Sequence, residues 1–435
     1  MDKTEYINHV NILKNELVCA LGCTEPIAIA YAASLARRAM GATPDHIKVL
    51  CSGNMIKNVK SVTVPNSNGM IGIEAAATLG VVGGNEDKAL EVLESITQED
   101  IKLTQKLLDN NFCSVEFVEG VPNLYVSVEA QKDDDTSVAT IEERHTNITV
   151  LTKNGVSVDF SSSDDDSSCS CVKDTKLECD RDALTLESIW NFIHDVDVED
   201  IRCCVENQIK CNSAIADEGI KNDWGANVGS TLLSTRPDDI IVRAKARAAA
   251  GSDARMNGCP MPVVIVCGSG NQGMTASLPV IEYAKHLNKS QDELIRAIAL
   301  SDLVAVHIKH YIGELSAFCG AVSAACGVGS AVCYLKGGNL DQVGNTIQNT
   351  LGNVSGIVCD GAKSSCAAKI ASSVDAALLG CDMALANQAF KPQEGLLGNS
   401  FEETIKNVGY VGRVGMCSTD IEILNIMTNK ADVEL

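Results

Sequence analysis

The second half of the chain is built from small residues, and this most constrains the fold. From about residue 183 to residue 435 the sequence is rich in alanine and glycine and is patterned as helices. Aromatic residues make up only 4% of the chain, although hydrophobic residues make up 45%. A core with so few aromatic side chains must be filled by alanine, valine, isoleucine, leucine and glycine, which favours closely packed helices. We therefore predict a mainly helical domain over 183–435.

Residues 46 to about 160 show a different pattern. His46–Cys51 reads as a strand, and so does 60–64, whereas 71–79 and 87–108 read as helices. Further β-branched or alternating runs lie between turns at 114–118, 124–130, 137–142 and 147–151. These patterns predict an α+β domain with an antiparallel sheet over 41–182, and an α+β fold class for the whole chain.

Residues 1–40 precede this domain and read as two helices that meet at Cys23-Thr24-Glu25-Pro26. Thr24 is the expected N-cap, with Glu25 and Pro26 in the first turn. We expect the segment 1–40 to carry Cys23 and to pack on the helical domain. Residues 158–180 are acidic and serine-rich, which predicts a solvated loop or linker.

Charge and hydropathy exclude several classes of partner. A formal net charge of −22 argues against nucleic acid, whose phosphates would be repelled. The most apolar segment, 321–335, is too short to span a bilayer and is interrupted by serine and glycine. The N-terminus lacks a signal-peptide pattern, so we predict a cytoplasmic protein without a membrane partner. Its 19 cysteines are then free thiols, a number that suggests an anaerobic host.

Three cysteines in the small-residue region could hold a metal cluster. Cys319, Cys359 and Cys366 have no obvious fourth partner, which suits a [4Fe–4S] cluster with one iron open to a substrate. On a single helix Cys359 and Cys366 would lie roughly 10 Å apart, at about 1.5 Å per residue. The turn dipeptide Asp360-Gly361 would instead bring Cys359 back onto the helix that carries Cys366. Core packing is the alternative for any one of these cysteines, and the spacing matches no common ferredoxin pattern.

Cys23 is a candidate catalytic residue. It lies just ahead of a predicted helix, where the positive end of the helix dipole lowers the pKa of a thiol. The thiol could act as a base, a nucleophile or a ligand. Alternatively, Cys23 has only a structural role, as a small residue in a tight turn between two helices.

A glycine loop at 267–275 is the clearest candidate for binding a substrate. A short apolar run leads into it and a helix follows, so backbone N–H groups face an anion such as a carboxylate or phosphate. Arg255, just upstream, offers a bidentate carboxylate contact, although a surface salt bridge is equally consistent. The candidate substrate-binding residues of the loop are Ser269, Asn271, Gln272, Gly273 and Thr275.

Two further polar motifs complete the candidate site. The polar loop 52–58 supplies Asn54, Lys57 and Asn58, which with His145 could form a second polar wall. His307 and His310 are three residues apart on a helix that precedes Cys319. They could share a metal, but we predict a catalytic role as base or hydrogen-bond partner near the cluster. Alternatively, His307 and His310 are surface residues without a role in the site.

Together these motifs resemble the L-cysteine desulfidase family, which is related to the iron–sulfur L-serine dehydratases. The resemblance rests on Gly22-Cys23-Thr24-Glu25-Pro26, 53–58, 268–273 and the three cysteines, and it covers nearly the whole chain. The acidic loop at 158–180 is its least typical part. The interval from Cys359 to Cys366 is also shorter than its counterpart in the serine dehydratases.

The resemblance implies an oxygen-labile [4Fe–4S] cluster on Cys319, Cys359 and Cys366. It also implies pyridoxal-independent β-elimination from L-cysteine, which yields pyruvate, ammonia and sulfide. In that chemistry we expect Cys23 to remove the Cα proton, and the 269–275 loop with Arg255 to hold the amino acid. Small-residue helices and a large apolar fraction further predict a homodimer.

Three alternatives remain open at this point. The same site could dehydrate L-serine. A pyridoxal-phosphate lyase would use Lys245 for its Schiff base, but that leaves the cysteines unexplained. The third alternative is a non-catalytic iron–sulfur sensor or thiol-storage protein. Such a protein would need no amino-acid pocket, whereas the glycine loop and Arg255 suggest that one is present.

Overall fold

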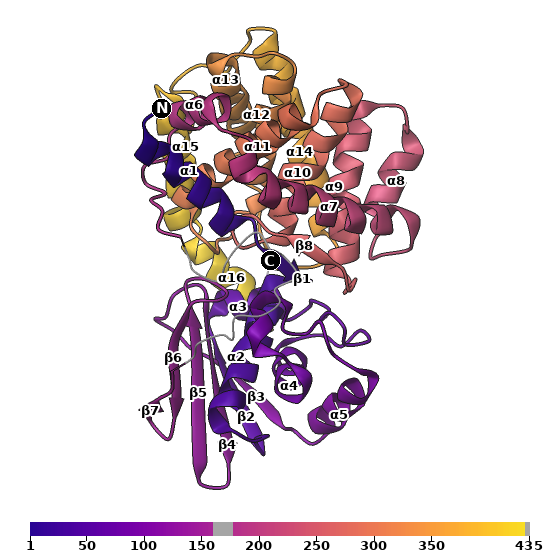
Figure 1. The fold of residues 1–435 in the computed structure, drawn as a ribbon, viewed down its shortest axis with the longest axis vertical. Coiled ribbons are helices and arrows are strands. Elements are labelled where there is room, and N and C mark those ends of the chain that lie inside the picture. Colours follow the sequence, from indigo (N-terminus) through magenta and orange to yellow (C-terminus); the bar gives the residue numbers. More distant parts are fainter. Residues whose placement is uncertain (160–176, 431–435) are drawn as a thin grey trace.

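The computed structural model describes residues 1–159 and 177–430, so most of the predicted acidic loop lies outside the described residues. The chain forms two parts that meet at a narrow waist (Figure 1). One part is a bundle of helices, and the other is a twisted sheet with helices on one face. The α+β fold class is confirmed.

The sheet is six-stranded, in the order β3-β2-β4-β5-β6-β7. Every neighbouring pair is antiparallel except β2 and β3, which are parallel with Ile47 opposite Cys113. The sheet is antiparallel as predicted except at this edge, where a helical crossover between β2 and β3 returns the chain to the same end of the sheet. The strands are β2 (His46–Cys51), β3 (Cys113–Phe117), β4 (Tyr125–Lys132), β5 (Asp135–Glu142), β6 (Ile148–Lys153) and β7 (Val156–Ser157).

Helix α2 (Thr24–Met40) packs against β4, β5 and β6, and α4 (Ile73–Gly83) packs against α2. Ser137 of β5 donates a hydrogen bond to the Ala36 carbonyl, 2.7 Å away, which fixes α2 on the sheet. A side chain at Gly80 would collide with the Ala30 backbone, so α2 and α4 approach more closely than larger residues would allow.

Three expected elements of this part differ from those observed. The stretch 52–58 is mostly a short helix, α3 (Gly53–Val59), rather than a loop, and 60–64 contributes only an isolated bridge from Thr63 to Ile71. The helix expected over 87–108 divides into a 3₁₀ turn, η1 (Glu86–Glu91), and α5 (Gln98–Asp109). Thr97 and Asp100 form a capping box, which starts α5 after the break.

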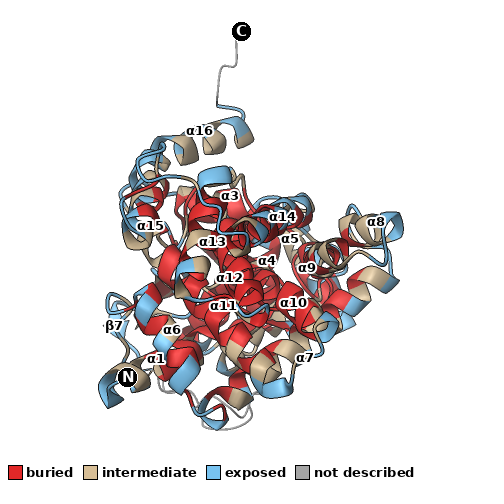
Figure 2. Cartoon of the chain, turned by 90° about the horizontal axis from the view of Figure 1, so that it is seen from above, coloured by how far each residue is buried: buried red, intermediate tan, exposed pale blue. Residues whose placement is uncertain are grey.

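The helical part surrounds α10, α11 and α12, most of whose residues are buried (Figure 2). A side chain at Gly327 of α12 would collide with the Ser301 carbonyl of α11, so small residues do allow close helix packing here. The helices are α1 (Lys3–Glu16), α6 (Leu186–Asp195), α7 (Glu199–Lys221), α8 (Val228–Thr235), α9 (Ile240–Met256), α10 (Gly270–His286), α11 (Gln291–Ile312), α12 (Gly320–Leu335), α13 (Leu340–Asn353), α14 (Cys366–Leu385), α15 (Phe401–Tyr410), the π-helical turn η2 (Val411–Gly415) and α16 (Cys417–Met427).

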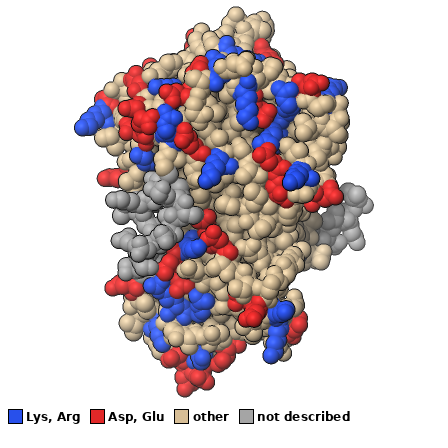
Figure 3. Space-filling view, turned by 45° about the vertical axis from the view of Figure 1, so that its right-hand side comes forward, with Lys and Arg blue, Asp and Glu red and all other residues tan. Residues whose placement is uncertain are grey.

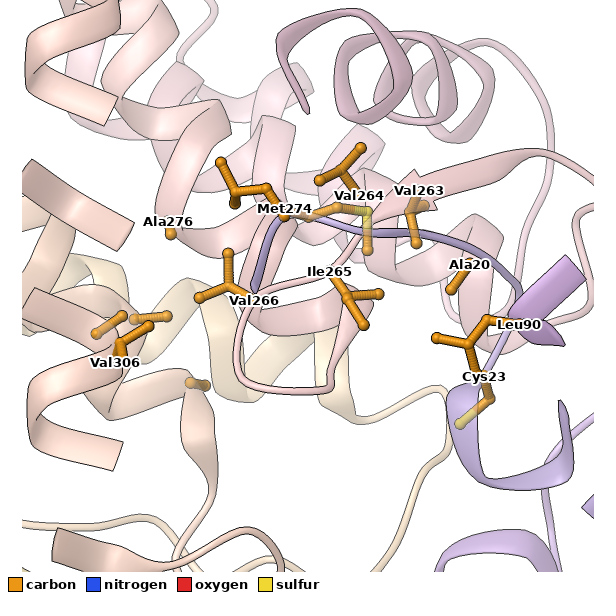
Figure 4. Close-up of a cluster of buried hydrophobic side chains, with 14 of the residues drawn as sticks. Ala20, Cys23, Leu90, Val263, Val264, Ile265, Val266, Met274, Ala276 and Val306 are labelled. Carbon is orange, nitrogen blue, oxygen red and sulfur yellow. The ribbon is translucent and has the colours of Figure 1, made fainter. Parts of the chain in front are cut away.

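The N-terminal segment joins the two parts. Helix α1 contacts α6, α7 and α11, and β1 (Cys19–Leu21) pairs antiparallel with β8 (Pro262–Val264), whereas α2 belongs to the sheet. Segment 1–40 therefore spans both parts instead of packing on the helical part alone. Figure 4 shows Val263 to Val266 in a buried apolar cluster that also includes Met274 and, at its edge, Cys23.

Acidic and basic side chains are interspersed over the helical part on the face shown in Figure 3. Within residues 1–159 and 177–430, none of the helices combines the length and apolarity needed to cross a membrane.

Candidate functional site

A cavity of about 100 Å³, partly open to solvent, lies where the two parts meet, and it brings together residues far apart in the sequence. Asn58 and His145 line it from the α+β part, and Cys23 and Glu25 line it from the start of α2. The helical part supplies all three cysteines of the predicted cluster and most of the glycine loop. The lining residues that sequence analysis singled out are Cys23, Asn58, His145, Arg255, Ser269, Asn271, Gln272, Cys319, Cys359 and Cys366.

Two of the three cysteines are placed side by side by a short backbone bridge. Phe318 and Val358 form an isolated antiparallel bridge. On either side of it, the Cys319 N–H donates to the Ile357 carbonyl at 2.8 Å, and the Cys359 N–H donates to the Ala317 carbonyl at 2.7 Å. The bridge thus joins the residue before α12 to the segment between α13 and α14.

Cys366 reaches the same cavity as the first residue of α14. Gly361 has φ of +96°, a left-handed conformation that glycine adopts freely, so the chain turns between Cys359 and Cys366. The Cys366 Sγ lies 3.8 Å from the Gly361 carbonyl oxygen. A side chain at Gly361 would also collide with the Lys57 carbonyl, which packs this turn against α3.

The three thiols differ in their tendency to ionise, and burial raises the pKa of Cys366. The Cys319 thiol donates to the Cys359 sulfur, and this bond, aided by nearby Lys57, lowers the pKa of Cys359 below its ordinary value. The same bond raises the pKa of Cys319. Lys57 is itself held by an ion pair with Asp420 of α16 and donates to the Cys359 carbonyl at 3.3 Å.

The three thiols fit an iron–sulfur cluster better than a single ion. Among the described residues, no three histidine, cysteine or acidic side chains are arranged to hold one metal ion. A cubane cluster binds each cysteine through a different iron, so its ligands lie farther apart than the ligands of a single ion. Cys319, Cys359 and Cys366 line one cavity, as the ligands of such a cluster must.

Cys23 and Glu25 form a hydrogen-bonded pair at the N-terminus of α2. The Cys23 thiol donates to Glu25 Oε2 at 3.1 Å, while the Asn58 amide donates to Glu25 Oε1 at 3.0 Å. Burial and the neighbouring Glu25 charge raise the pKa of Cys23 well above its ordinary value. This is opposite to the lowering predicted from the helix dipole, because Cys23 is buried beside a carboxylate.

Glu25 is the ionised member of the pair. Burial alone would raise the pKa of Glu25, but His145, the Cys23 thiol and Arg255 outweigh it and lower the pKa. The pair therefore has an ionised carboxylate that accepts a hydrogen bond from a neighbouring thiol. Sequence analysis placed Glu25 in the right motif but gave it no chemical role.

The cavity walls carry buried polar atoms that have no hydrogen-bond partner within residues 1–159 and 177–430. The Arg255 Nε donates to the Gly22 carbonyl at 2.9 Å, but its Nη2 is buried and unpaired. Buried polar groups are normally satisfied, so such a set indicates a missing ligand. The other unpaired atoms in the cavity wall are Asn58 Oδ1, His145 Nε2, Asn271 Oδ1 and Gln272 Oε1.

Two glycines hold the loop against these groups. A side chain at Gly270 would collide with the Arg255 guanidinium, and one at Gly320 would collide with the Gln272 amide. Gln272 is thereby pressed against the turn that carries Cys319. The glycine loop is therefore fitted to both the arginine and the first cysteine.

Six predicted site residues do not line this cavity. The Lys57 ammonium forms an ion pair with Asp420, and Asn54 is buried in α3. Gly273 packs on Val264, and Thr275 donates to the Asn271 carbonyl within α10. His307 bonds to Glu402 at 2.7 Å. His310 bonds to Asp182 at 2.7 Å and lines a separate, outer cavity.

Lys309, between these two histidines, does line the inner cavity, together with Cys267 and Glu314. Sequence analysis assigned these three residues no role. Lys245, the lysine of the pyridoxal alternative, pairs with Asp375 at 2.6 Å and does not line the cavity.

The fold and site define a two-part α+β protein with a pocket lined by thiols and by unpaired polar groups. The model of the serine dehydratase alpha chain family matches residues 87–425, and the chain belongs to this family. It is 48% identical over 424 residues to the UPF0597 protein of Lachnoclostridium phytofermentans, which covers 98% of this chain and 100% of that protein. The UPF0597 protein of Finegoldia magna is 46% identical over 424 residues, covering 97% and 100%. The UPF0597 protein of Vibrio campbellii is 38% identical over 430 residues, covering 98% and 99%.

Proposed function

We propose that this protein is an L-cysteine desulfidase that eliminates sulfide from L-cysteine at a [4Fe–4S] cluster. The observation that carries the proposal is the set of unpaired buried polar atoms facing three thiols in one small cavity. An amino acid satisfies such a set, because it offers a carboxylate and an ammonium close together. Membership of the serine dehydratase alpha chain family supports a lyase acting on a small hydroxy or thiol amino acid.

Arg255 would bind the substrate carboxylate through its free Nη2, since a guanidinium pairs well with a carboxylate. The amide oxygens of Asn271 and Gln272 would accept hydrogen bonds from the substrate ammonium. These contacts fix the Cα between the glycine loop and the start of α2. The substrate then bridges the two parts of the protein.

Cys319, Cys359 and Cys366 would hold the cluster. When bound, such a cluster supplies a Lewis-acidic iron that polarises the substrate and stabilises negative charge on the departing sulfur. The low pKa of Cys359 favours the thiolate form that iron requires.

Cys23 and Glu25 would remove the Cα proton. Glu25 carries the negative charge and both residues line the cavity, so the Cys23 thiol would pass its proton to the carboxylate while its sulfur takes the Cα proton. The Cα–H and Cβ–S bonds break, the carbon–carbon double bond forms, and sulfur leaves with the electron pair as hydrosulfide. The resulting 2-aminoacrylate tautomerises to the imine, which takes up one water to give pyruvate and ammonium.

The test is sulfide and pyruvate release from L-cysteine by protein purified and assayed without oxygen. We expect equal amounts of the two products, with loss of activity as air bleaches the broad absorbance of the cluster. Protein with an intact cluster that yields neither product would disprove the proposal.

L-Serine is the second candidate substrate, and the name of the matching family supports it. The same residues would bind it, but hydroxide is a poorer leaving group than hydrosulfide. We therefore expect a lower kcat/KM for L-serine than for L-cysteine in the same preparation. The opposite order would make the protein an L-serine dehydratase.

A further inference from the structure

A second, larger cavity of about 620 Å³ adjoins the inner one. The two cavities have five lining residues in common, so the same side chains form the partition between them. These residues are Cys267, Lys309, Glu314, Leu315 and Ser316. The outer cavity therefore lies directly against the inner one, and only these side chains separate the two.

Lys309 is the unusual member of this partition. It lies near the end of α11 and is only 6% exposed. Within residues 1–159 and 177–430 its ammonium has neither a hydrogen-bond nor an ion-pair partner, in contrast with Lys57, which is paired with Asp420. An isolated ammonium is expensive to bury, so an anion that binds there would recover much of that cost.

Glu314 lines both cavities with Lys309, but among the described residues the two side chains form no ion pair. Burial and the charge of Glu16 raise the pKa of Glu314, whereas the charges of Arg144, Lys309 and Arg181 lower it. Burial likewise raises the pKa of Cys267 and favours its neutral thiol. Burial lowers the pKa of Lys309, and negative charge on the surrounding cysteines opposes this.

We propose that Lys309 binds the hydrosulfide released from the substrate and directs it into the outer cavity. This inference rests on the proposed function. An amino acid brings a single carboxylate, which the free Nη2 of Arg255 accounts for. The second cation in the cavity wall shares that wall with the cysteines that would hold the cluster, and it can also bind the negative charge that arises on the departing sulfur during reaction. Carboxylates and the arginines Arg144, Arg181 and Arg413 also line the outer cavity, and Lys309 is the cation that the two cavities share.

The first test measures inhibition of pyruvate formation by added sulfide, using the loaded enzyme near pH 8, where hydrosulfide predominates. We expect sulfide to inhibit the wild type, and Lys309→Met to raise the inhibition constant by about tenfold or more, as loss of a charged hydrogen bond predicts. Lys309→Arg keeps the charge and should stay near the wild-type value. Lys406→Met, at an exposed lysine outside both cavities, is the matched control. Equal inhibition of the wild type and Lys309→Met would overturn the proposal.

The second test does not depend on turnover. Crystals soaked in bromide should show an anomalous peak within hydrogen-bond distance of Lys309 Nζ in the wild type and none in Lys309→Met. Bromide that binds no better there than at exposed lysines would mean an adventitious ion only and would overturn the anion site. If wild-type enzyme makes no pyruvate from L-cysteine, the proposed function fails, while the bromide result still decides the anion site.

A measurement of thermal stability distinguishes anion binding by Lys309 from a structural role of this residue. Methionine has nearly the shape of lysine and removes an unpaired buried charge, so Lys309→Met should unfold at the same or a higher temperature than the wild type. A lower unfolding temperature would show that Lys309 supports the fold and would overturn its assignment as an anion ligand.

Discussion

Glu25 carries the negative charge of the hydrogen-bonded pair at the start of α2, and Cys23 carries the proton. Replacing Glu25 with glutamine keeps the shape but removes the acceptor of the proton. We expect Glu25→Gln to lower kcat by about 100-fold or more, the usual contribution of a general base. The measurement is pyruvate formation at saturating L-cysteine, with the cluster absorbance recorded on the same sample.

Cys23→Ser should also lose most of its activity, because a serine hydroxyl gives up its proton far less readily than a thiol. Cys113→Ser, at a half-buried cysteine of β3 away from the cavity, is the control for cysteine replacement in general. Full turnover by Cys23→Ser with an unchanged cluster spectrum would contradict the role assigned to this pair.

Arg255 presents one free guanidinium nitrogen to the cavity while its Nε holds the Gly22 carbonyl. Lysine keeps the charge but cannot make both contacts at once. We expect Arg255→Lys to raise the KM for L-cysteine by about 10- to 100-fold, as expected for loss of a hydrogen bond to a charged group. Arg243→Lys, whose arginine is outside the cavity, should leave KM unchanged. A change in kcat alone would place Arg255 in the chemical step instead.

At the scale of elements, Asp302 joins α11 to α7 through Gln208, which donates to it at 3.0 Å. Burial raises the pKa of Asp302 to about 8, so the folded protein keeps its proton at pH values where the unfolded chain has lost it. The folded state then binds more protons, and stability falls as pH rises between about pH 4 and pH 8, by about 1.4 kcal/mol per pH unit from this group.

Asp302→Asn removes this titration and retains the oxygen that accepts from Gln208. We expect the variant to lose less stability than the wild type between about pH 6 and pH 8, as measured by the urea concentration at half-unfolding. Parallel loss in both proteins would show that Asp302 is already ionised in the folded state.

Helix α16 stabilises the cysteine segments from outside, although none of its residues is fully buried (Figure 2). Asp420 pairs with Lys57 and accepts from the Ala317 N–H at 3.0 Å. Asp420→Asn would leave Lys57 charged and buried without its partner, at a cost of about 3–5 kcal/mol. We expect the variant to retain less iron per chain than the wild type. Lys57→Met combined with Asp420→Asn should recover part of the loss, and no recovery would contradict this coupling.

Regular elements were predictable where local pattern and packing agree. Alternation placed β4 and β5, and the run of small apolar residues placed α12. Helix α3 was missed because Gly53 and Asn54 are poor helix formers. What holds it is tertiary, since α16 covers its first turn and Asp420 holds Lys57. The start of α5 was readable, because Thr97 and Asp100 have capping-box spacing.

At the scale of the whole molecule, sequence motifs named residue types but not the direction in which each side chain points. Successive residues of a helix are rotated by about 100°. His307 therefore meets Glu402 on α15, while Lys309 faces the cavity. No local pattern distinguishes these two directions. The burial that reverses the expected pKa of Cys23 is likewise set by how the two parts pack together.

The thiols that would hold the cluster belong to the helical part, but the contacts that position them cross to α3 and α16. Lys57 reaches the Cys359 carbonyl, its own carbonyl packs on Gly361, and Asp420 holds Ala317. Iron loading should therefore stabilise α3 and α16 together with the cysteine segments, because ligands that bind only the folded state stabilise it. We expect amide hydrogen exchange in α3 and α16 to slow by about tenfold or more on loading, which corresponds to about 1.4 kcal/mol, with β6 unchanged. Protection confined to 317–320 and 357–366 would mean that the cluster acts within the helical part alone. The Asp420→Asn variant should lose the protection of α16 first, since it removes the contact between α16 and Ala317.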